Sequence, residues 1–353
     1  MQPTKETNVL IVQGSIPHYR KAVFNLLAER YNVTVIHSGS RTVMPLDNYR
    51  EKITPVKKVC VFNLQEGVIS ELKRGIYDVV IVMFDLRWPY NLLALFYKKY
   101  SRILLWGHRY GKNPVANYLR DISMKYSDGI ILYSTEDIPE MVRRGITQSS
   151  IYVAHNTMYV KNHSDLSMYA KNSFLYVGRA QKRKGIDQLL IAFAELRPNL
   201  PENIKINIVG EGDENIKLKK LAEKLGINDK VVFYGEVTDE QQLKSLFQEA
   251  YAYVSPGHIG LGVMHSFAYG VPVITSASAL HAQEFFNLEN KKNSLLFNDF
   301  EDFKKSLMLI CSDLNNRLEL GREAYMLYSN ERKIENMVDG FNCAINNVAD
   351  IDL

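Results

Sequence analysis

Residues 253–275 read YVSPGHIGLGVMHSFAYGVPVIT, and this stretch decides the fold of the second half of the chain. The apolar run at 250–254 predicts a buried strand, and the glycine-rich segment after it predicts a tight loop. Apolar residues then recur at helical spacing until Gly270, where glycine can take the left-handed conformation that ends a helix. Residues 271–275 predict the next strand. The stretch therefore predicts a strand, a glycine loop, a short helix and a second strand.

The start of this short helix is a candidate anion site. The first N–H groups of a helix have no partner inside it, and the helix dipole places roughly half a positive charge at that end. A phosphate can bind there when few side chains stand in the way. A plain strand–helix–strand crossover with a glycine turn would give the same pattern, so the stretch alone leaves both interpretations open.

Length and composition predict two domains in a globular protein. The chain has 353 residues, more than one hydrophobic core usually serves, with 46% hydrophobic and 23% charged residues. No run approaches the roughly 20 apolar residues that span a bilayer, and residues 1–7 show no signal peptide. The three cysteines are odd in number and far apart, which favours a reducing compartment over a disulfide frame or a cysteine metal site. We expect a cytoplasmic protein.

Charge is spread unevenly along the chain. Residues 1–165 hold 22 lysine and arginine residues against 14 aspartate and glutamate residues, a net charge of +8. The rest of the chain has a net charge of −4. The basic first half indicates an anionic partner such as a membrane surface, a polyanionic acceptor or nucleic acid. Lysines that only solvate helix faces are the alternative.

The first half alternates short apolar runs with helical patterns. Strands are predicted at residues 8–13, 32–37, 78–83, 102–106, 129–133 and 150–154, with 59–62 as a further candidate. Helices are predicted at 17–31, 91–100 and 114–126. Continuous apolar runs between helices are typical of a parallel sheet that is covered on both faces. We therefore predict one α/β domain over residues 1–165.

A second α/β series follows the polar segment 160–172, which we interpret as a linker. Strands are predicted at residues 173–177, 205–209, 230–234, 250–254 and 271–275, with helices between them. This second domain is predicted to span residues 172–330. Residues 331–353 contain a last helix with no strand after it, and we expect it to pack back on the first domain. Ligands of such sheets usually bind at the carboxyl ends of the strands, so we expect a cleft between the two domains.

Two cations in the second domain point to a diphosphate ligand. Gly178 and Arg179 follow a predicted strand, and Lys184 comes five residues later. The guanidinium offers a planar fork for phosphate oxygens, while the ammonium is a compact point charge. With the helix start at 260–263 they could hold a diphosphate without a metal ion. No Gly-Lys-Ser/Thr follows a strand, so the site is not a P-loop; solvated loop charges are the alternative.

Four segments of the second half resemble the C-terminal domain of family 4 glycosyltransferases. They are 177–187 (VGRAQKRKGID), 208–213 (IVGEGD), 232–237 (VFYGEV) and 253–275, in the family's order and spacing. The first half fits more loosely, through Gly14, 16–20 (IPHYR), 106–108 (WGH) and 155–156 (HN). The resemblance implies a GT-B fold, in which two Rossmann-like domains with a parallel sheet each face one another across a cleft. It also implies a retaining transferase that uses a nucleotide-sugar donor.

The resemblance implies a role for each matching residue. Arg179 and Lys184 would hold the donor diphosphate and neutralise the leaving nucleotide, and His108 would reach the donor sugar. A core histidine is the alternative for His108, and Glu284 matches a family glutamate whose role we leave open. The residues expected to bind the donor are Gly14, Ser15, Gly178, Gly210, Val237, Gly260, Leu261, Gly262, His265 and Glu284.

The sequence departs from the family at two positions. The family usually carries two glutamates that flank the glycine turn, eight positions apart, where this chain has Gly257 and His265. A histidine can still hydrogen-bond a ribose hydroxyl. Without the first carboxylate, the usual contact with the donor sugar is missing. A non-catalytic protein of the same fold is therefore an alternative.

The resemblance thus implies transfer of a hexosyl or N-acetylhexosaminyl group from a UDP-sugar or related donor, with retention and without a metal. The expected acceptor is a glycan or a lipid-linked glycan in the synthesis of surface polysaccharide or lipopolysaccharide. Residues 90–102 combine apolar, aromatic and basic side chains, so we expect contact with the inner face of the membrane and none with nucleic acid. An ordinary amphipathic helix is the alternative for this segment.

Three other functions are alternatives to glycosyl transfer. A sugar-nucleotide epimerase can share the fold but needs an acid–base pair that we cannot assign. A non-catalytic nucleotide-sugar-binding protein would agree with Gly257 and His265. A nicotinamide-dependent oxidoreductase would need Gly-x-Gly-x-x-Gly after the first strand, and residues 13–16 do not supply it.

Overall fold

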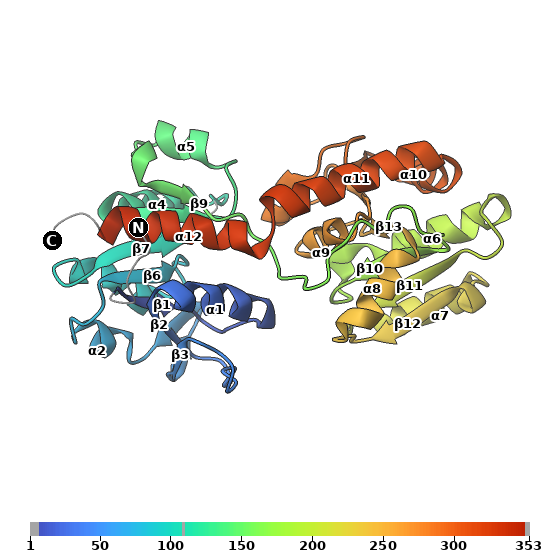
Figure 1. Ribbon diagram of the computed structural model, residues 1–353. Helices are drawn as coiled ribbons and strands as arrows, with labels where there is room; N and C mark the ends of the chain where they lie inside the picture. Colours follow the sequence, from blue (N-terminus) through green and yellow to red (C-terminus); the bar gives the residue numbers. More distant parts are fainter. Residues whose placement is uncertain (1–6, 108–109, 350–353) are drawn as a thin grey trace. The chain divides into compact units, whose positions relative to one another are not determined.

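The computed structural model describes residues 7–107 and 110–349, and the chain divides into two compact units (Figure 1). Unit 1 runs up to Tyr159 and resumes at Ile334, and unit 2 comprises Val160–Lys333. Each unit consists of a parallel sheet with helices on both faces. By sequence count, unit 1 has 21 basic and 17 acidic residues, and unit 2 has 22 of each. The acidic end of the chain therefore offsets half of the basic excess that residues 1–165 carry.

The main sheet of unit 1 has the strand order β3-β2-β1-β6-β7-β8-β9, and every neighbouring pair is parallel. Ile11 of β1 lies opposite Val35 on one side and Ile81 on the other. Successive side chains point to opposite faces, so apolar strands of this kind need cover on both. The strands are β1 (Asn8–Val12), β2 (Asn32–His37), β3 (Arg50–Ile53), β6 (Val79–Met83), β7 (Arg102–Trp106), β8 (Gly129–Leu132) and β9 (Ile151–Val153).

Helices cover both faces of this sheet. On one face α1 (Lys21–Arg30) and α12 (Ile334–Ala349) form a core with the side chains of alternate strand residues. On the other face lie α2 (Val68–Leu72), α3 (Pro89–Leu92) with the 3₁₀ turn η2 (Leu93–Tyr97), α4 (Pro114–Tyr126) and α5 (Ile138–Arg143). The C-terminal helix thus belongs to unit 1. Gly340 lets it approach β9, because an added Cβ would overlap the carbonyl of Val153.

Unit 1 differs from the sequence-based prediction in two places. The strand predicted at 59–62 is wrong: β4 (Val56–Val59) and β5 (Phe62–Gln65) form an antiparallel hairpin with Cys60, at φ 51°, in its turn. The edge strand β3 has the polar sequence REKI and gave no apolar signal. The helix predicted at 91–100 is the shorter α3 followed by η2.

The sheet of unit 2 has the order β12-β11-β10-β13-β14-β15, again with parallel neighbours. Its strands are β10 (Ser173–Val177), β11 (Lys205–Val209), β12 (Val231–Gly235), β13 (Ala250–Val254), β14 (Val273–Ser276) and β15 (Ser294–Phe297). Its helices are α6 (Ile186–Leu196), α7 (Asn215–Lys224), α8 (Glu240–Gln248), α9 (Gly262–Ala268), α10 (Phe300–Ser312) and α11 (Leu314–Glu331).

The segment that we interpreted as a linker is packed on unit 2. The amides of Ser164 and Leu166 donate to the carbonyls of Ala268 and Tyr269, at 3.0 and 3.1 Å. The buried ammonium of Lys171 donates to two backbone carbonyls, at 2.8 and 2.9 Å. Unit 2 therefore begins at Val160, about a dozen residues before its first strand. Over the described ranges, no helix is long and apolar enough to cross a membrane.

Candidate functional site

The candidate site of unit 2 lies at the carboxyl edge of its sheet. Strands β11, β10 and β13 are neighbours, so the loops that follow them leave the sheet side by side. These loops are residues 210–214, 178–185 and 255–261. The carboxyl edge is where ligands of parallel α/β sheets usually bind. Every segment that carried the family resemblance in this half ends at or near this edge.

Tyr253 joins the loop after β10 to the start of α9. Its hydroxyl donates to the carbonyl of Val177 at 3.3 Å, and an added Cβ on Gly262 would overlap that hydroxyl. Tyr176 stacks on Tyr253, with ring centroids 6.3 Å apart, and donates to the carbonyl of Arg179 at 2.9 Å. The two tyrosines therefore fix the backbone of Arg179 beside the first turn of α9. Sequence reasoning assigned no role to either ring.

A second junction joins the lysine loop to the glycine loop. The amides of Gly257 and His258 donate to the carbonyls of Lys184 and Arg183, both at 2.8 Å. The ammonium of Lys184 donates to the carbonyl of His258 at 2.9 Å. An added Cβ on Gly257 would overlap the carbonyl oxygen of Arg183. Glycine at position 257 is therefore a packing requirement here, because a glutamate could not fit while the two loops stay paired.

Lys184 is a half-buried cation with donors to spare. Burial lowers the pKa of its ammonium to about 8, with a smaller contribution from Arg183, while Glu284 opposes the shift. An ammonium has three N–H donors, and one is used on His258. Arg179 has an exposed side chain on a fixed backbone. An anion that reached both cations would stabilise the charged form of Lys184.

The start of α9 is open at Gly260. Val263 and Met264 donate their amides to the carbonyls of Gly260 and Leu261, at 3.0 Å each, as the first turn of the helix. The amides of residues 260–262 precede these donors, so the helix offers them no acceptor. An added Cβ on Gly260 would meet nothing within 4 Å. The predicted contacts of Gly260, Leu261 and Gly262 with a donor remain a prediction.

Glycines also bring the loops after β10, β11 and β12 together. Gly178 has φ +147°, and an added Cβ on Gly210 would overlap its carbonyl. Gly210 itself has φ +117° and donates its amide to the carbonyl of Gly235 at 2.6 Å. Val237, in the loop after β12, is half-buried. The predicted role of Gly178, Gly210 and Val237 around the nucleotide remains a prediction.

His265 and Glu284 are both buried in unit 2, His265 in α9 and Glu284 in the turn that follows β14. The ring of His265 lies against Phe247 and Tyr269, with centroids 4.7 and 5.7 Å away. Burial lowers the pKa of His265 to about 4, so the ring is neutral at neutral pH. Glu284 lies in the 3₁₀ turn Gln283–Asn287, where its charge acts on Lys184. Both residues remain predicted donor contacts.

Two further histidines support the glycine loop and were missed by the sequence. His258 has its pKa lowered to about 4 by burial and then by Lys184 and Arg183. His281 accepts the amide of Ile259 on Nδ1 at 3.1 Å, and its Nε2 lies 2.7 Å from the carbonyl of Ser276. Neither histidine belongs to a motif with a characteristic spacing, so the sequence offers no signal that would predict these contacts.

In unit 1 the structure brings together three loosely matching motifs. Arg20 is buried, and its guanidinium carbon lies 4.8 Å from the ring centroid of Trp106 and 5.2 Å from that of Tyr133. Its Nη2 donates to Oδ1 of Asn156 at 2.7 Å. Arg20, Trp106 and Asn156, one residue from each of the three segments, thus meet at the carboxyl edge of the unit 1 sheet. His108 itself lies outside the described residues.

The loop after β1 carries Gly14 and Ser15. An added Cβ on Gly14 would lie 2.7 Å from Cζ2 of Trp88, so the indole closes over the glycine. The amide of Ser38 donates to the carbonyl of Gly14 at 3.0 Å. The loop after β1 is therefore held between the loops after β6 and β2. The predicted part of Gly14 and Ser15 in donor binding stays a prediction.

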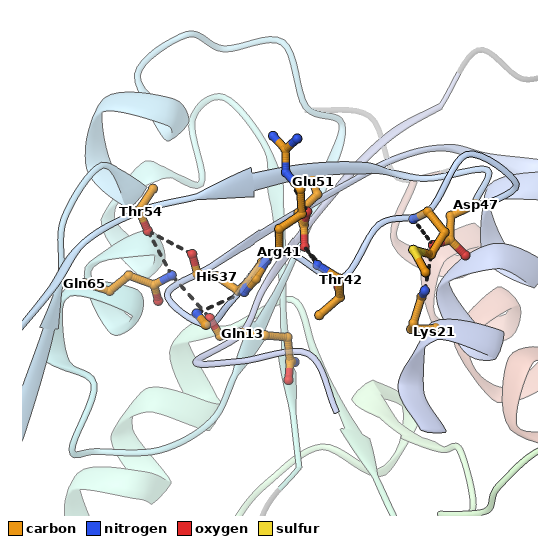
Figure 2. A network of polar contacts seen from close by, with 11 residues as sticks. Gln13, Lys21, His37, Arg41, Thr42, Asp47, Glu51, Thr54 and Gln65 are labelled. Atoms are coloured by element: carbon orange, nitrogen blue, oxygen red, sulfur yellow. Dashed lines mark hydrogen bonds and ion pairs between the residues drawn. The ribbon is translucent and has the colours of Figure 1, made fainter. Parts of the chain in front are cut away.

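A polar network holds the loop that follows β2 (Figure 2). The amide of Gly39 donates to Nδ1 of the buried His37, so Nε2 carries the proton and donates to Oε1 of Glu51, at 3.1 and 2.8 Å. The amide and hydroxyl of Thr42 donate to the same oxygen, at 2.8 and 2.9 Å. Burial raises the pKa of Glu51, but these donors outweigh it and hold the pKa below its ordinary value.

The same network continues on either side of His37 (Figure 2). Lys21 pairs with Asp47 at 2.9 Å, and Nδ2 of Asn25 donates to Asp47 at 2.8 Å, which ties the far end of the loop to α1. Nε2 of Gln65 donates to the carbonyl of Gln13 at 3.2 Å. The loops after β1 and β2 are thus fixed mainly by side chains that are distant in sequence.

The chain resembles glycosyltransferases both in sequence and in structure. Residues 164–326 match the family described as "Glycosyl transferases group 1". An uncharacterized glycosyltransferase of Haemophilus influenzae is 27% identical over 338 residues, which cover 90% of this chain and 92% of the relative. The lipopolysaccharide glucosyltransferase WaaG of Escherichia coli is 32% identical over 111 residues, which cover 30% of this chain and 28% of WaaG.

The fold also matches solved structures over nearly the whole chain. The crystal structure of HepE from Anabaena in complex with UDP has a TM-score of 0.72 at 14% identity, covering 97% of this chain and 100% of HepE. HepE and the other solved structures that match the chain are GT-B glycosyltransferases. The predicted α/β fold of the GT-B type is therefore confirmed.

Proposed function

We propose that the chain is a glycosyltransferase, as the match of residues 164–326 to the group 1 family supports, and that it transfers a hexosyl or N-acetylhexosaminyl group with retention. The donor is a nucleotide-diphosphate sugar, and UDP is the nucleotide. The complex of HepE with UDP supports that choice of nucleotide. The acceptor is a glycan or a lipid-linked glycan of a surface polysaccharide or lipopolysaccharide. The relationship to WaaG supports this acceptor class.

One observation carries the proposal: the backbones that bear Arg179 and Lys184 are both tied to the glycine loop that starts α9. Tyr253 and the stacked Tyr176 make the first tie, and the paired loops at Gly257 make the second. Two cations and a helix start then share one edge of the sheet. Preorganised positive groups of this kind stabilise the charge that develops on a leaving diphosphate.

In the proposed reaction the bond between the anomeric carbon and the diphosphate oxygen breaks, and a bond from that carbon to the acceptor hydroxyl oxygen forms on the same face. The proton of the acceptor hydroxyl passes to the leaving phosphate. Arg179 and Lys184 stabilise that phosphate while its charge grows. The neutral ring of His265 hydrogen-bonds a ribose hydroxyl in place of the family's glutamate.

We further propose that the reaction needs no metal ion. Two side-chain cations and the amides at residues 260–262 supply the positive charge that a metal would otherwise provide. Transfer that is unchanged by excess EDTA, after exhaustive dialysis, is the expected result. Activity that is lost with EDTA and restored by one divalent cation would contradict this part of the proposal.

The proposal is tested with a panel of UDP-sugars, by following UDP release with and without a lipid-linked glycan acceptor. Release that depends on the acceptor is expected with one donor, and the anomeric configuration of the product is read by NMR. Arg179→Ala and Lys184→Ala should each lower transfer on the order of 100-fold with the fold retained. Lys182→Ala is the matched control, because Lys182 is an exposed cation of the same loop. Normal turnover in both site variants would overturn the proposal.

A non-catalytic nucleotide-sugar-binding protein is the second candidate, and Gly257 favours it. Its packing excludes the carboxylate that the family places near the transferred sugar. Tight UDP binding without transfer to any acceptor would support this candidate. An epimerase would instead interconvert two UDP-sugars in the absence of an acceptor.

A further inference from the structure

Position 257 leaves a donor sugar without the carboxylate that the family usually provides. An added Cβ on Gly257 would overlap the carbonyl oxygen of Arg183, and the amide of Gly257 donates to the carbonyl of Lys184 at 2.8 Å. No side chain can therefore leave the loop at this position while the two loops stay paired. A sugar hydroxyl that gives up its water needs another partner, because an unpaired polar group costs free energy.

The glycine loop 255–261 offers one other side chain for this contact. The loop contains no acidic residue, and its polar side chains are those of Ser255 and His258. Ser255 is fully buried, and its hydroxyl donates to the carbonyl of His258 at 3.3 Å. His258 is only half-buried. The imidazole of His258 is therefore the polar side chain of this loop that a ligand can reach.

Backbone hydrogen bonds hold His258 beside Lys184. The amide of His258 donates to the carbonyl of Arg183 at 2.8 Å, and its carbonyl accepts from the ammonium of Lys184 at 2.9 Å. Both backbone groups are thus used in the junction between the two loops. The ring starts from a fixed place next to the ammonium that we assign to the donor diphosphate. In a nucleotide sugar the transferred sugar is attached directly to that diphosphate.

The residue that follows His258 is fixed as well. Ile259 is buried, and its amide donates to Nδ1 of His281 at 3.1 Å. Its carbonyl oxygen lies 2.5 Å from Nδ1 of His258. One residue further along, an added Cβ on Gly260 would meet nothing within 4 Å. The ring of His258 is therefore oriented by a fixed carbonyl, and the same loop borders open space.

The contact with Ile259 decides which ring nitrogen of His258 accepts a hydrogen bond. A carbonyl oxygen only accepts, so Nδ1 carries the proton and donates to Ile259. Burial, and then Lys184 and Arg183, lower the pKa of His258 to about 4, so the ring is neutral at neutral pH. Its Nε2 then has a lone pair. Within residues 7–107 and 110–349, no side chain or backbone group hydrogen-bonds this nitrogen.

We propose that His258 replaces the carboxylate of the family and that its Nε2 accepts a hydrogen bond from one hydroxyl group of the donor sugar. His258 is thus a specificity-determining residue for the sugar. A neutral ring with one lone pair accepts one hydrogen bond, whereas a carboxylate accepts several. The inference rests on the proposed nucleotide-sugar donor, and it applies equally to a transferase and to a non-catalytic binding protein.

The test compares the affinities for UDP and for a UDP-sugar by calorimetric titration. The probe is whichever of UDP-glucose, UDP-galactose, UDP-N-acetylglucosamine and UDP-N-acetylgalactosamine the wild type binds most tightly. UDP is the matched control, because it has the same nucleotide and diphosphate and lacks only the sugar. In His258→Ala the affinity for the UDP-sugar should fall about five- to tenfold, the effect of one lost hydrogen bond. The affinity for UDP and the melting temperature should stay unchanged.

Two further variants distinguish sugar binding from support of the loop. The amide of glutamine reaches the place of Nε2, whereas the shorter amide of asparagine lies at the place of Nδ1. His258→Gln should therefore keep most of the affinity for the UDP-sugar, and His258→Asn should lose as much as His258→Ala. If the ring only held the loop through the carbonyl of Ile259, the order of these two variants would be reversed.

Two results would overturn this inference while UDP binding stays intact. One is the same ratio of UDP-sugar to UDP affinity in the wild type and in His258→Ala. The other is recovery of that ratio by asparagine but not by glutamine. A fall of both affinities together with the melting temperature in His258→Ala would also overturn it, because the ring would then support the fold. A wild type that binds neither UDP nor any UDP-sugar would instead overturn the proposed function itself, and this inference with it.

Discussion

The two units hold their carboxyl-edge loops in different ways. In unit 2 the loop that carries Lys184 and the glycine loop before α9 are joined by backbone hydrogen bonds and by a glycine that allows close approach, where Gly257 meets Arg183 and Lys184. In unit 1 the loops are joined by side chains, as where Glu51 accepts hydrogen bonds from Thr42 and His37. A backbone junction tolerates almost no added atom, whereas a side-chain network can lose one member and keep the rest.

This difference agrees with the tasks proposed for the two units. A diphosphate is the same in every nucleotide-sugar donor, so its site gains from a rigid cradle of amides and two fixed cations. Acceptors vary between enzymes, and loops fixed by side chains can change with them. The predictions below test whether the backbone junctions are as intolerant, and the side-chain network as tolerant, as this comparison requires.

The largest effect is expected from Gly257→Glu, which restores the residue usual in the family. The new Cβ would overlap the carbonyl of Arg183, so the loop that carries Lys184 must move. We expect a loss of about 2–4 kcal/mol in the free energy of unfolding and loss of detectable UDP binding. Denaturant unfolding and calorimetric titration with UDP measure the two effects.

Gly260→Ala is the matched control for this experiment. Its Cβ would enter open space, so stability should change by less than about 1 kcal/mol. A Gly257→Glu protein that is as stable as the wild type and binds UDP equally well would show that the paired loops are not a constraint. The backbone side of the comparison would then fail.

The next largest effect concerns pH and Lys184. Burial holds the pKa of its ammonium at about 8, below the ordinary value for lysine, so in the free protein the cation is lost as pH rises through about 8. Because UDP binds the charged form, its affinity should fall by about tenfold per pH unit above that value, and binding should take up a proton. Calorimetric titrations in buffers of different ionisation enthalpy measure that uptake. In Lys184→Arg the guanidinium stays charged, and both effects should disappear.

The sequence predicted unit 2 better than unit 1, and the physical reason is the kind of junction. Gly178, Gly210, Gly257 and Gly262 are visible in a sequence because a positive φ or a close approach of other atoms demands glycine at a fixed place. The position of Lys184 followed from the same pattern. What the sequence could not supply was the role of Tyr176 and Tyr253, because their apolar rings pack as core residues and only their hydroxyls make the ties.

In unit 1 the sequence carries less information about the loops. His37 and Glu51 are 14 residues apart, and Gln65 reaches Gln13 across 52 residues. No short motif encodes such pairs, and the polar strand β3 that carries Glu51 was missed for the same reason. The exposed apolar side of α4 was also not predicted, because its spacing is that of an ordinary core helix until the structure shows which side is buried.

A smaller effect is expected from Glu51→Gln in the network of unit 1. An amide can still accept one hydrogen bond from Thr42 or His37, so the loss should be about 1–2 kcal/mol in the free energy of unfolding. The pKa of Glu51 is lower in the folded protein than in the unfolded chain. Its contribution is therefore present at neutral pH and is lost as pH falls through the folded pKa, so the variant should show a shallower loss of stability in acid.

Denaturant unfolding between neutral pH and pH about 3 checks this prediction. Glu66→Gln is the control, because Glu66 is exposed on the adjoining hairpin. If the free energy of unfolding falls with decreasing pH in the same way in both variants, Glu51 is not the group whose ionisation stabilises the loop. Should Glu51→Gln cost as much as Gly257→Glu, the side-chain network would be no more tolerant than the backbone junctions.

The smallest effect belongs to the pair of Lys21 and Asp47 at the edge of the network. The side chain of Lys21 is 24% exposed, and exposed or partly exposed ion pairs contribute only about 0.2–1 kcal/mol. Lys21→Ala should therefore cost less than Asp47→Ala, because Asp47 also accepts from Asn25 and from the amide of Met44. A double-mutant cycle in denaturant isolates the coupling between the two charges, which should weaken with added salt. If the coupling free energy exceeded the whole loss of unfolding free energy in Glu51→Gln, the exposed ion pair would stabilise the loop more than the buried hydrogen bonds of Glu51 do. That result would contradict the comparison.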